Sequence, residues 1–261
     1  MEKIGEIPRK IREMLGEGPF SRDTIGLSGA QIFCGENWVL KIETLGEESR
    51  REYELLKWLD RKLPVPRVLG YAQQGEKQYL LMSRMEGEML CAPHFLKDPE
   101  KMTRLLSQAF STLWQVDVTG CPCPDTTEKK LRRAEKRVAA GLCTREEAEP
   151  ETYGPGGFSS PERLLLWLQE NRPEEEPVFS HGDFCLPNLL VGEGGISGYL
   201  DWGRGGVSDR YQDLSLCCRS LRYNRKEQGG PEFSPQRLFF ALGLTPDWEK
   251  LRYYQLLDEL L

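Results

Sequence analysis

The sequence has few of the residues that bind zinc: only two histidines occur among its 261 residues, and its eight cysteines form no pair of Cys-x-x-Cys motifs. A structural zinc ion needs a closely spaced set of such ligands, so a zinc site is not expected. We interpret the cysteines as reduced, mostly buried thiols, which are typical of a cytoplasmic protein. Any functional metal should therefore be bound by oxygen.

Other absences narrow the class of protein. No apolar run approaches the roughly 20 residues that cross a bilayer, and the charged N-terminus, MEKIGEIPRKIREMLGEGPF, lacks the apolar segment of a secretory signal. The net charge of −6 and the lack of a basic stripe argue against nucleic-acid binding. We expect a cytoplasmic globular enzyme, a monomer or a weak dimer, that binds neither membrane nor nucleic acid.

The spacing of apolar residues divides the chain into two parts. Strands are expected at residues 24–26, 30–34, 38–42, 67–71 and 78–82, with one helix over 46–62. After Gly87 apolar residues recur mostly at helical spacing, and the acidic stretch 144–162 has the composition of an exposed loop. We predict an α+β fold of two lobes: a small antiparallel sheet with one helix over 1–83, a hinge at 84–88, and a larger, mainly helical lobe over 89–261. A ligand would bind between the lobes.

Three polar residues stand near two apolar runs that resemble buried strands. Asp183 and Asn188 interrupt VFSHGDFCLPNLLV at 178–191, and the run at 196–200 leads directly into Asp201. Phosphoryl transfer uses Mg²⁺, which prefers oxygen ligands, and a carboxylate that orients the attacking hydroxyl. The spacing agrees with the kinase catalytic loop H-R-D-x-x-x-x-N and the later D-F-G. We therefore predict that Asp183 is catalytic and that Asn188 and Asp201 bind magnesium.

Two positions depart from that kinase pattern, and each polar residue has a simpler explanation. Gly182 replaces the Arg of the loop, and Trp202 replaces the Phe that follows the metal-binding acid. Asp183 could cap a loop, Asn188 could serve a turn, and Asp201 could pair with a base. Their combination favours phosphoryl transfer. His181 is expected to be a packed, hydrogen-bonded structural residue.

Kinase chemistry also needs a lysine and a glutamate that together hold the nucleotide phosphates. Lys41 lies within the apolar strand pattern 38–42, and Glu52 lies on the helix that follows, with Glu54 as the alternative. An exposed lysine on an edge strand is the competing explanation for Lys41. The loop GLSGA at 26–30 could offer backbone amides to phosphates, although an ordinary hairpin turn has the same composition.

Several longer segments resemble one family. HGDFCLPN, SGYLDWGR and the C-terminal PDWEKLRYYQLLDELL, together with WLDRKLPVPRVL, LLMSRMEG and PEEEPVFSHGD, are similar to segments of the aminoglycoside 3'-phosphotransferases. These are bacterial antibiotic-resistance kinases with a protein-kinase-like fold. The resemblance extends from about residue 22 to the C-terminus. The HGD motif is shared with choline kinases and other small-molecule kinases, whereas the C-terminal segment is more discriminating.

The resemblance assigns roles to individual positions. It implies that Asp183 is catalytic, that Asn188 and Asp201 bind magnesium, and that Lys41 and Glu52 hold the phosphates. It further implies nucleotide contacts from Ser28, Met82, Ser83 and Met85, and substrate contacts from Arg204, Arg219, Glu259, the carboxylate of Leu261, and Glu149 and Glu151 in the acidic loop. Two positions differ from some members: Leu186 stands where they carry an acid, and Val39 where they carry an aromatic ring.

The expected activity is transfer of the γ-phosphate of ATP or GTP, with Mg²⁺, to the 3'-hydroxyl of drugs such as kanamycin and neomycin. An aminoglycoside is a polycation, so the acids at 146–151 and 258–259 and the C-terminus suit it, whereas those at 174–176 are expected to be a solvated face. Two alternatives stay open. One is a kinase for choline, homoserine or a macrolide, and the other is a non-catalytic nucleotide-binding protein.

Overall fold

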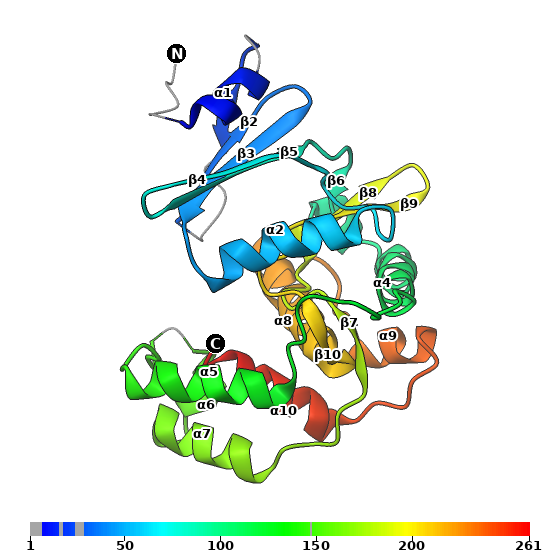
Figure 1. Ribbon diagram of the computed structural model, residues 1–261. Helices are drawn as coiled ribbons and strands as arrows, with labels where there is room; N and C mark the ends of the chain where they lie inside the picture. The colour runs from blue at the N-terminus through cyan, green and yellow to red at the C-terminus, as the bar shows by residue number, and fades with distance from the viewer. Residues whose placement is uncertain (1–6, 16–17, 24–28, 147) are drawn as a thin grey trace. The chain divides into compact units, whose positions relative to one another are not determined.

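The computed structural model describes residues 7–15, 18–23, 29–146 and 148–261 (Figure 1). The chain divides into two compact units: unit 1 contains Met1–Leu90 and Pro187–Gly205, and unit 2 contains Cys91–Leu186 and Gly206–Leu261. The segment Pro187–Gly205 thus groups with the N-terminal residues, whereas it was expected in the C-terminal lobe. The hinge at 84–88 stays a prediction, and its residues fall within unit 1.

Unit 1 is built on a five-stranded antiparallel sheet in the order β1-β2-β3-β5-β4. The strands are β1 (Ser21–Asp23), β2 (Gln31–Cys34), β3 (Trp38–Thr44), β4 (Val68–Gln74) and β5 (Lys77–Ser83). Leu40 of β3 lies opposite Phe33 of β2 and Leu81 of β5, and these apolar side chains form a core with Ile11 of α1 (Arg9–Leu15). Because side chains alternate along a strand, Lys41 projects from the opposite face.

Two parts of the N-terminal region need comment: the strand expected at 24–26 and helix α1. The expected strand at 24–26 falls outside the described residues, and β1 is found just before it. The short helix α1 was not predicted, since only one residue of its seven, Ile11, is buried and no apolar stripe marks it.

The predicted helix is α2 (Glu47–Leu59), which begins where its sequence provides a cap. The Gly46 amide donates to Ser49 Oγ at 2.8 Å, which satisfies a polar group at the helix start. Leu55, Leu56 and Leu59 recur at helical spacing and are buried. Glu52 lies on the same buried face, where an unpaired carboxylate would be costly.

A second small sheet of unit 1 has the order β6-β8-β9, formed by β6 (Glu88–Met89), β8 (Leu189–Gly192) and β9 (Gly195–Tyr199). The β8–β9 hairpin is antiparallel, and beyond its open end the Leu200 amide donates to the Asn188 carbonyl at 2.9 Å. Asn188, at the end of the short helix η1 (Leu186–Asn188), is therefore beside the residue that precedes Asp201. Asp201 itself adopts a left-handed backbone, with φ 61°.

Unit 2 is mainly helical, as expected. Its helices are α3 (Pro93–Leu96), α4 (Pro99–Trp114), α5 (Thr127–Ala139), α6 (Pro150–Tyr153), α7 (Pro161–Glu170), α8 (Arg210–Gln228), α9 (Pro235–Ala241) and α10 (Trp248–Asp258). Helix α8 packs against α10 and against β7 (Pro177–Ser180), which pairs with β10 (Gly206–Asp209). The stretch 144–162, expected as an exposed loop, contains helix α6, whose Thr152 is buried. Within the described residues, no helix combines the length and apolarity that a membrane crossing requires.

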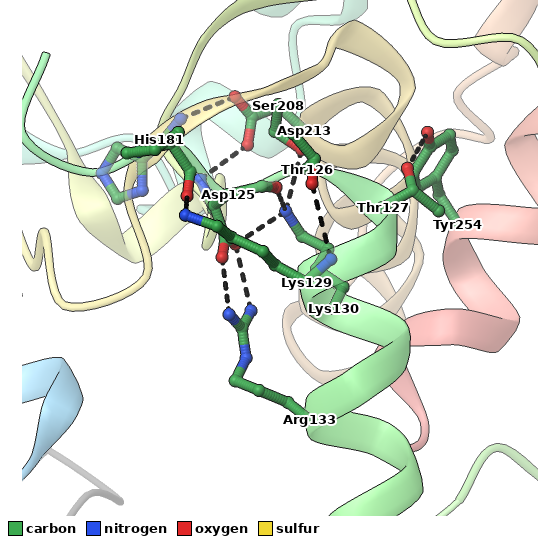
Figure 2. A network of polar contacts seen from close by, with 12 residues as sticks. Asp125, Thr126, Thr127, Lys129, Lys130, Arg133, His181, Ser208, Asp213 and Tyr254 are labelled. Atoms are coloured by element: carbon green, nitrogen blue, oxygen red, sulfur yellow. Dashed lines mark hydrogen bonds and ion pairs between the residues drawn. The ribbon is translucent and has the colours of Figure 1, made fainter.

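A buried ionic network joins α5 to strand β10 (Figure 2). Lys130 Nζ lies 2.7 Å from Asp125 Oδ2 and 2.8 Å from Ser208 Oγ, and Arg133 contacts both oxygens of Asp125 at 2.5 and 3.0 Å. Burial raises the pKa of Asp125, but the two cations outweigh it and hold the pKa well below its usual range. The Asp125 amide also donates to the Val207 carbonyl at 2.8 Å. The network thus fixes β10, whose partner β7 leads directly into residues 181–183.

Candidate active site

Lys41 is the centre of a group of carboxylates in unit 1. Its Nζ lies 2.8 Å from Glu52 Oε2, 3.3 Å from Asp201 Oδ1 and 3.7 Å from Glu43 Oε2. Strand β3 supplies Lys41 and Glu43 two residues apart on one face, α2 supplies Glu52, and the turn after β9 supplies Asp201. The structure therefore brings together three of the residues predicted from the sequence, and Glu52 rather than Glu54 is the partner of the lysine.

The carboxylates keep this lysine charged. Burial lowers the pKa of Lys41, but Glu52, Asp201 and Glu43 outweigh it and leave the pKa above its ordinary value. Burial also raises the pKa of Glu43, to about 7, with Lys41 acting in the opposite direction. The Trp202 amide donates to the carboxylate of Glu52, which ties α2 to the turn that carries Asp201. A charged lysine fixed in this way suits the binding of phosphate oxygens.

Asp201 and Asn188 offer the oxygen ligands that a magnesium ion would need. The Asp201 side chain is 45% exposed, in contrast with Lys41 at 10% and Glu52 at 3%, so it is the most accessible of the three to a metal ion. No group of three or more His, Cys, Asp or Glu residues arranged around a metal is found in the described part of the chain. The pair of oxygen donors from Asp201 and Asn188 fits Mg²⁺, which commonly uses one or two protein ligands and takes the others from substrate phosphates and water.

In unit 2, Asp183 follows β7 in a loop whose backbone is held from helix α8. The amides of His181 and Gly182 donate to the two carboxylate oxygens of Asp213 at 2.7 and 2.9 Å (Figure 2). The His181 ring is fully buried, packs edge-on against Phe184, and accepts from the Asp183 amide at 3.3 Å. His181 is thus a packed, hydrogen-bonded residue, as expected. The Asp183 side chain is half-buried and accepts from Cys185 Sγ at 3.0 Å.

A second group of charges surrounds the C-terminal end of α10. Arg219 of α8 pairs with Asp258 Oδ2 at 2.5 Å, and Glu259 Oε2 accepts from the Glu149 amide at 3.2 Å. Arg222 pairs with Glu149 at 3.0 Å. Burial raises the pKa of Glu259 to about 7, while the Glu149 amide and Arg219 partly offset the effect. This group, which we call the C-terminal acidic cluster, brings together Arg219, Glu259 and Glu149, three of the residues to which the resemblance assigns substrate contacts.

The C-terminus is itself held in place. Arg137 Nε donates to the Leu260 carbonyl at 3.1 Å, and the Leu261 amide donates to the Asp258 carbonyl at 3.1 Å. Leu261 therefore follows the acidic cluster directly along the chain. Glu151 is exposed on α6, and no contact joins it to the cluster among the interactions described.

The remaining predicted residues lie in unit 1 or outside the described residues. Met82 is buried on β5, opposite Val39, and Ser83 makes two hydrogen bonds with the backbone of Arg67, at 2.8 and 2.9 Å. Met85 lies beside Gly198 of β9. Arg204 is half-buried in the turn after Asp201, and Ser28 lies outside the described residues.

A comparison with known families decides the identity of the fold and its chemistry. The profile of the Phosphotransferase enzyme family matches residues 20–254. The chain belongs to this family. It is also 36% identical, over 262 residues, to a protein of Niallia circulans named aminoglycoside 3'-phosphotransferase, and the match covers 97% of this chain and 96% of the relative. The resemblance predicted from the motifs is confirmed.

Solved structures of phosphotransferases share the fold. A crystal structure of aminoglycoside-3'-phosphotransferase of type VIII matches with a TM-score of 0.77 and 27% identity, covering 97% of this chain and 98% of that one. Aminoglycoside phosphotransferase APH(3'')-Id from Streptomyces rimosus, in complex with ADP and streptomycin, matches with a TM-score of 0.76 and 21% identity, covering 96% of each chain. The predicted α+β, kinase-like fold is confirmed.

Four residues of this phosphotransferase were missed as site residues in the sequence. Glu43 could have been found, because it lies two positions from Lys41 on the same strand and so shares its face. Asp258 stands next to Glu259, but the sequence marks it only as one of several acids in a negative field. Asp213 and Cys185 have no sequence signal that marks them as site residues, because Asp213 is 30 residues from the loop that it holds and Cys185 belongs to no recognisable cysteine motif.

Proposed function

We propose that this phosphotransferase moves the γ-phosphoryl group of ATP or GTP to the 3'-hydroxyl of aminoglycosides such as kanamycin and neomycin. The observation that carries the proposal is the Lys41 group, in which a buried, charged lysine is held by Glu52 at 2.8 Å and Asp201 at 3.3 Å. Such a lysine is the part that a kinase needs to bind nucleotide phosphates. The relative from Niallia circulans, named for the 3' reaction, supports the acceptor.

The proposed roles follow the chemistry of the transfer. A new bond forms between the acceptor oxygen and the γ-phosphorus, the bond from that phosphorus to the β,γ-bridging oxygen breaks, and ADP leaves. Asp183 orients the acceptor hydroxyl and takes its proton, while Lys41 binds phosphate oxygens. Asn188 and Asp201 would hold magnesium, which neutralises developing charge when bound. Asp183 and Asn188 are five residues apart, so one short loop serves both tasks.

The proposed base site involves Met82, Ser83 and Met85. Ser83 closes β5 and is fixed by its bonds to Arg67, so the backbone that follows it is in a defined position. Val39, opposite Met82, offers an aliphatic surface to a base rather than an aromatic one. Ser28 is proposed to contact the phosphates from its loop.

The acidic cluster supports a polycationic acceptor. Asp258, Glu259 and Glu149 belong to the C-terminal acidic cluster, in which Arg219 pairs with Asp258 and the Glu149 amide donates to Glu259. A field of carboxylates attracts ammonium groups and raises the rate of encounter with them. Burial that raises the pKa of Glu259 to about 7 also means that an approaching ammonium group would favour its ionised form. Glu151 and Arg204 are proposed as further contacts to the drug.

Matched acceptors test the proposal. Kanamycin B and tobramycin differ only in that tobramycin lacks the 3'-hydroxyl, so drug-dependent release of ADP is expected with the first and not with the second. The product of kanamycin B should gain one phosphoryl group, and phosphorus-coupled NMR should place it on the 3'-oxygen. Equal turnover of both drugs would contradict the 3' position. Turnover of choline, homoserine or a macrolide, with no aminoglycoside accepted, would contradict the substrate class.

The role of Asp183 is tested separately from nucleotide binding. The Asp183→Ala variant is expected to lose drug phosphorylation almost completely and to bind ADP with the affinity of the wild type in calorimetry. Lys41→Ala should instead weaken ADP binding, because its cation contacts phosphate. If Asp183→Ala lost ADP binding together with its folded circular dichroism spectrum, a purely catalytic role for Asp183 would be wrong.

The proposal includes a cytoplasmic location, where nucleoside triphosphates are supplied, and a chain that acts as a monomer or weak dimer. Light scattering at micromolar protein concentration gives the mass of the particle. Measuring turnover per chain across a dilution series then shows whether association contributes to activity. A turnover per chain that falls as dilution separates the chains would contradict a functional monomer.

A further inference from the structure

The thiol of Cys185 donates a hydrogen bond to the predicted catalytic residue. Its Sγ lies 3.0 Å from Asp183 Oδ1, and its backbone amide donates to the Asp183 carbonyl at 2.8 Å. The thiol is half-buried, two residues beyond Asp183 in the same turn. A cysteine thiol is ordinarily a weak donor, and a carboxylate is the acceptor best able to use it.

The environment keeps this thiol protonated. Burial raises the pKa of Cys185 far above its ordinary value, and the charge of Asp183 raises it further. Arg219 acts in the opposite direction without reversing the effect. The sulfur therefore carries its hydrogen at neutral pH and is a hydrogen-bond donor rather than a nucleophile.

The turn that carries both residues is fixed at its two ends by helix α8. Before Asp183, the Gly182 amide donates to Asp213 at 2.9 Å, and after Cys185 the Leu186 amide donates to Ser220 Oγ at 2.9 Å. With the backbone held at both ends, the sulfur is presented to the carboxylate in a defined direction.

We propose that Cys185 is a positioning residue, whose thiol holds Oδ1 of Asp183 so that the second carboxylate oxygen is aimed at the acceptor hydroxyl. This inference rests on the proposed function, because it assumes that Asp183 orients the acceptor. It adds a donor that sets the angle of the catalytic carboxylate. A small misorientation of such a group is costly because reacting atoms must lie close and aligned.

Three variants separate this role from simple packing. Cys185→Ala removes the donor, Cys185→Ser replaces it with a hydroxyl donor, and Cys218→Ala removes a half-buried thiol from the neighbouring helix α8. A hydrogen bond to a charged group is strong enough that its loss should lower kcat for kanamycin about tenfold or more in Cys185→Ala. KM for drug and nucleotide should stay within about twofold of wild type, since neither substrate loses a contact.

The serine variant decides between the two explanations. We expect Cys185→Ser to recover most of the lost kcat and Cys218→Ala to keep wild-type kcat. Equal losses in the alanine and serine variants of Cys185 would show that volume rather than the hydrogen bond matters, and would overturn the inference. Undiminished kcat in Cys185→Ala would overturn it as well.

The hydrogen bond itself is measured without substrate. The S–H stretching band of Cys185 is isolated as the infrared difference between the wild type and Cys185→Ala, and it should move to higher frequency in Asp183→Asn, where the acceptor is weaker. A band unaffected by Asp183→Asn overturns the bond. If the wild type phosphorylates kanamycin and Cys185→Ala does so with the same kcat, this inference is wrong and the proposed function stands. A wild type inactive toward every aminoglycoside overturns the proposed function, and the infrared band then decides the bond.

Discussion

The buried network around Asp125 allows a quantitative test of how the loop-bearing hairpin is supported. In Asp125→Ala the ammonium of Lys130, 3% exposed, loses its carboxylate at 2.7 Å, and Arg133 loses both of its contacts to that side chain. The Asp125 carbonyl and Ser208 Oγ, at 2.7 and 2.8 Å, stay as neutral acceptors for Lys130. Breaking a buried pair by removing one partner costs about 3–5 kcal/mol, because the other charge stays buried. We expect that loss in the free energy of unfolding.

A second ion pair on the same helix provides the control. Glu128 pairs with Arg132 at 2.5 Å, but these side chains are 56% and 71% exposed. Such pairs contribute about 0.2–1 kcal/mol, so Glu128→Ala should cost no more than about 1 kcal/mol. Urea titration of the intact chain at pH 7, followed by tryptophan fluorescence, measures both variants. If Asp125→Ala lay within about 1 kcal/mol of the wild type, the reasoning from burial would be wrong.

The same pair predicts a dependence on pH. The folded-state pKa of Asp125 is held well below its usual range, so its contribution to stability is complete above the unfolded-state pKa, about 3.9. As pH falls below that value the unfolded chain binds a proton that the folded chain does not, and the contribution declines. The difference between the wild type and Asp125→Ala should therefore be constant from about pH 7 to 5 and should narrow below about pH 4. A difference that grew on acidification would contradict the sign.

Two further predictions concern the site. Asp213→Asn replaces one of two acceptor oxygens, so the amide of His181 or Gly182 loses its partner; an unsatisfied buried donor costs about 1–3 kcal/mol. We expect a lower melting temperature by calorimetry and a fall in kcat that is larger than the change in KM. An unchanged kcat would show that the hydrogen bonds to Asp213 do not position the loop. Because the pKa of Glu259 is raised to about 7, its carboxylate is protonated at lower pH, so KM for kanamycin should rise as pH falls from about 8 to about 6. The wild-type KM is divided by the KM of Glu259→Gln at each pH, because both values contain the same titration of the drug amines. A ratio that does not change with pH would show that Glu259 does not bind the drug.

The local parts of the site could be predicted because they depend on short-range order. Lys41 and Glu52 are 11 residues apart, on a strand and on the helix directly after it. The alternation of the strand and the 3.6-residue period of the helix fix which face each side chain occupies. The turn from β9 likewise had to deliver Asp201, since the apolar run 196–200 ends there. Strand alternation and helix period can therefore predict contacts within one supersecondary unit, but not between distant units.

The distant contacts could not be predicted in this way. Asp213 binds the loop amides from about 30 residues away, and Ser208 meets Lys130 across 78 residues. Helix α8 buries polar and apolar residues alike, among them Asp213, Ser215 and Ser220, as a helix packed on several sides does. Its apolar residues therefore form no single stripe from which the side facing the loop could be identified. Tertiary packing, rather than local pattern, selects these partners.

The discontinuity of unit 1 has a consequence for how the protein is made. The ribosome completes residues Met1–Leu90 long before Pro187–Gly205 emerges, and at about 5–20 residues per second the delay is roughly 6–23 seconds. During that interval the nascent chain already contains Lys41, Glu43 and Glu52, but strands β8 and β9 and the carboxylate of Asp201 have not been synthesised. The N-terminal fragment is therefore an incomplete folding unit on the ribosome. An early stop codon or a domain graft cut after residue 90 would leave it without its second sheet.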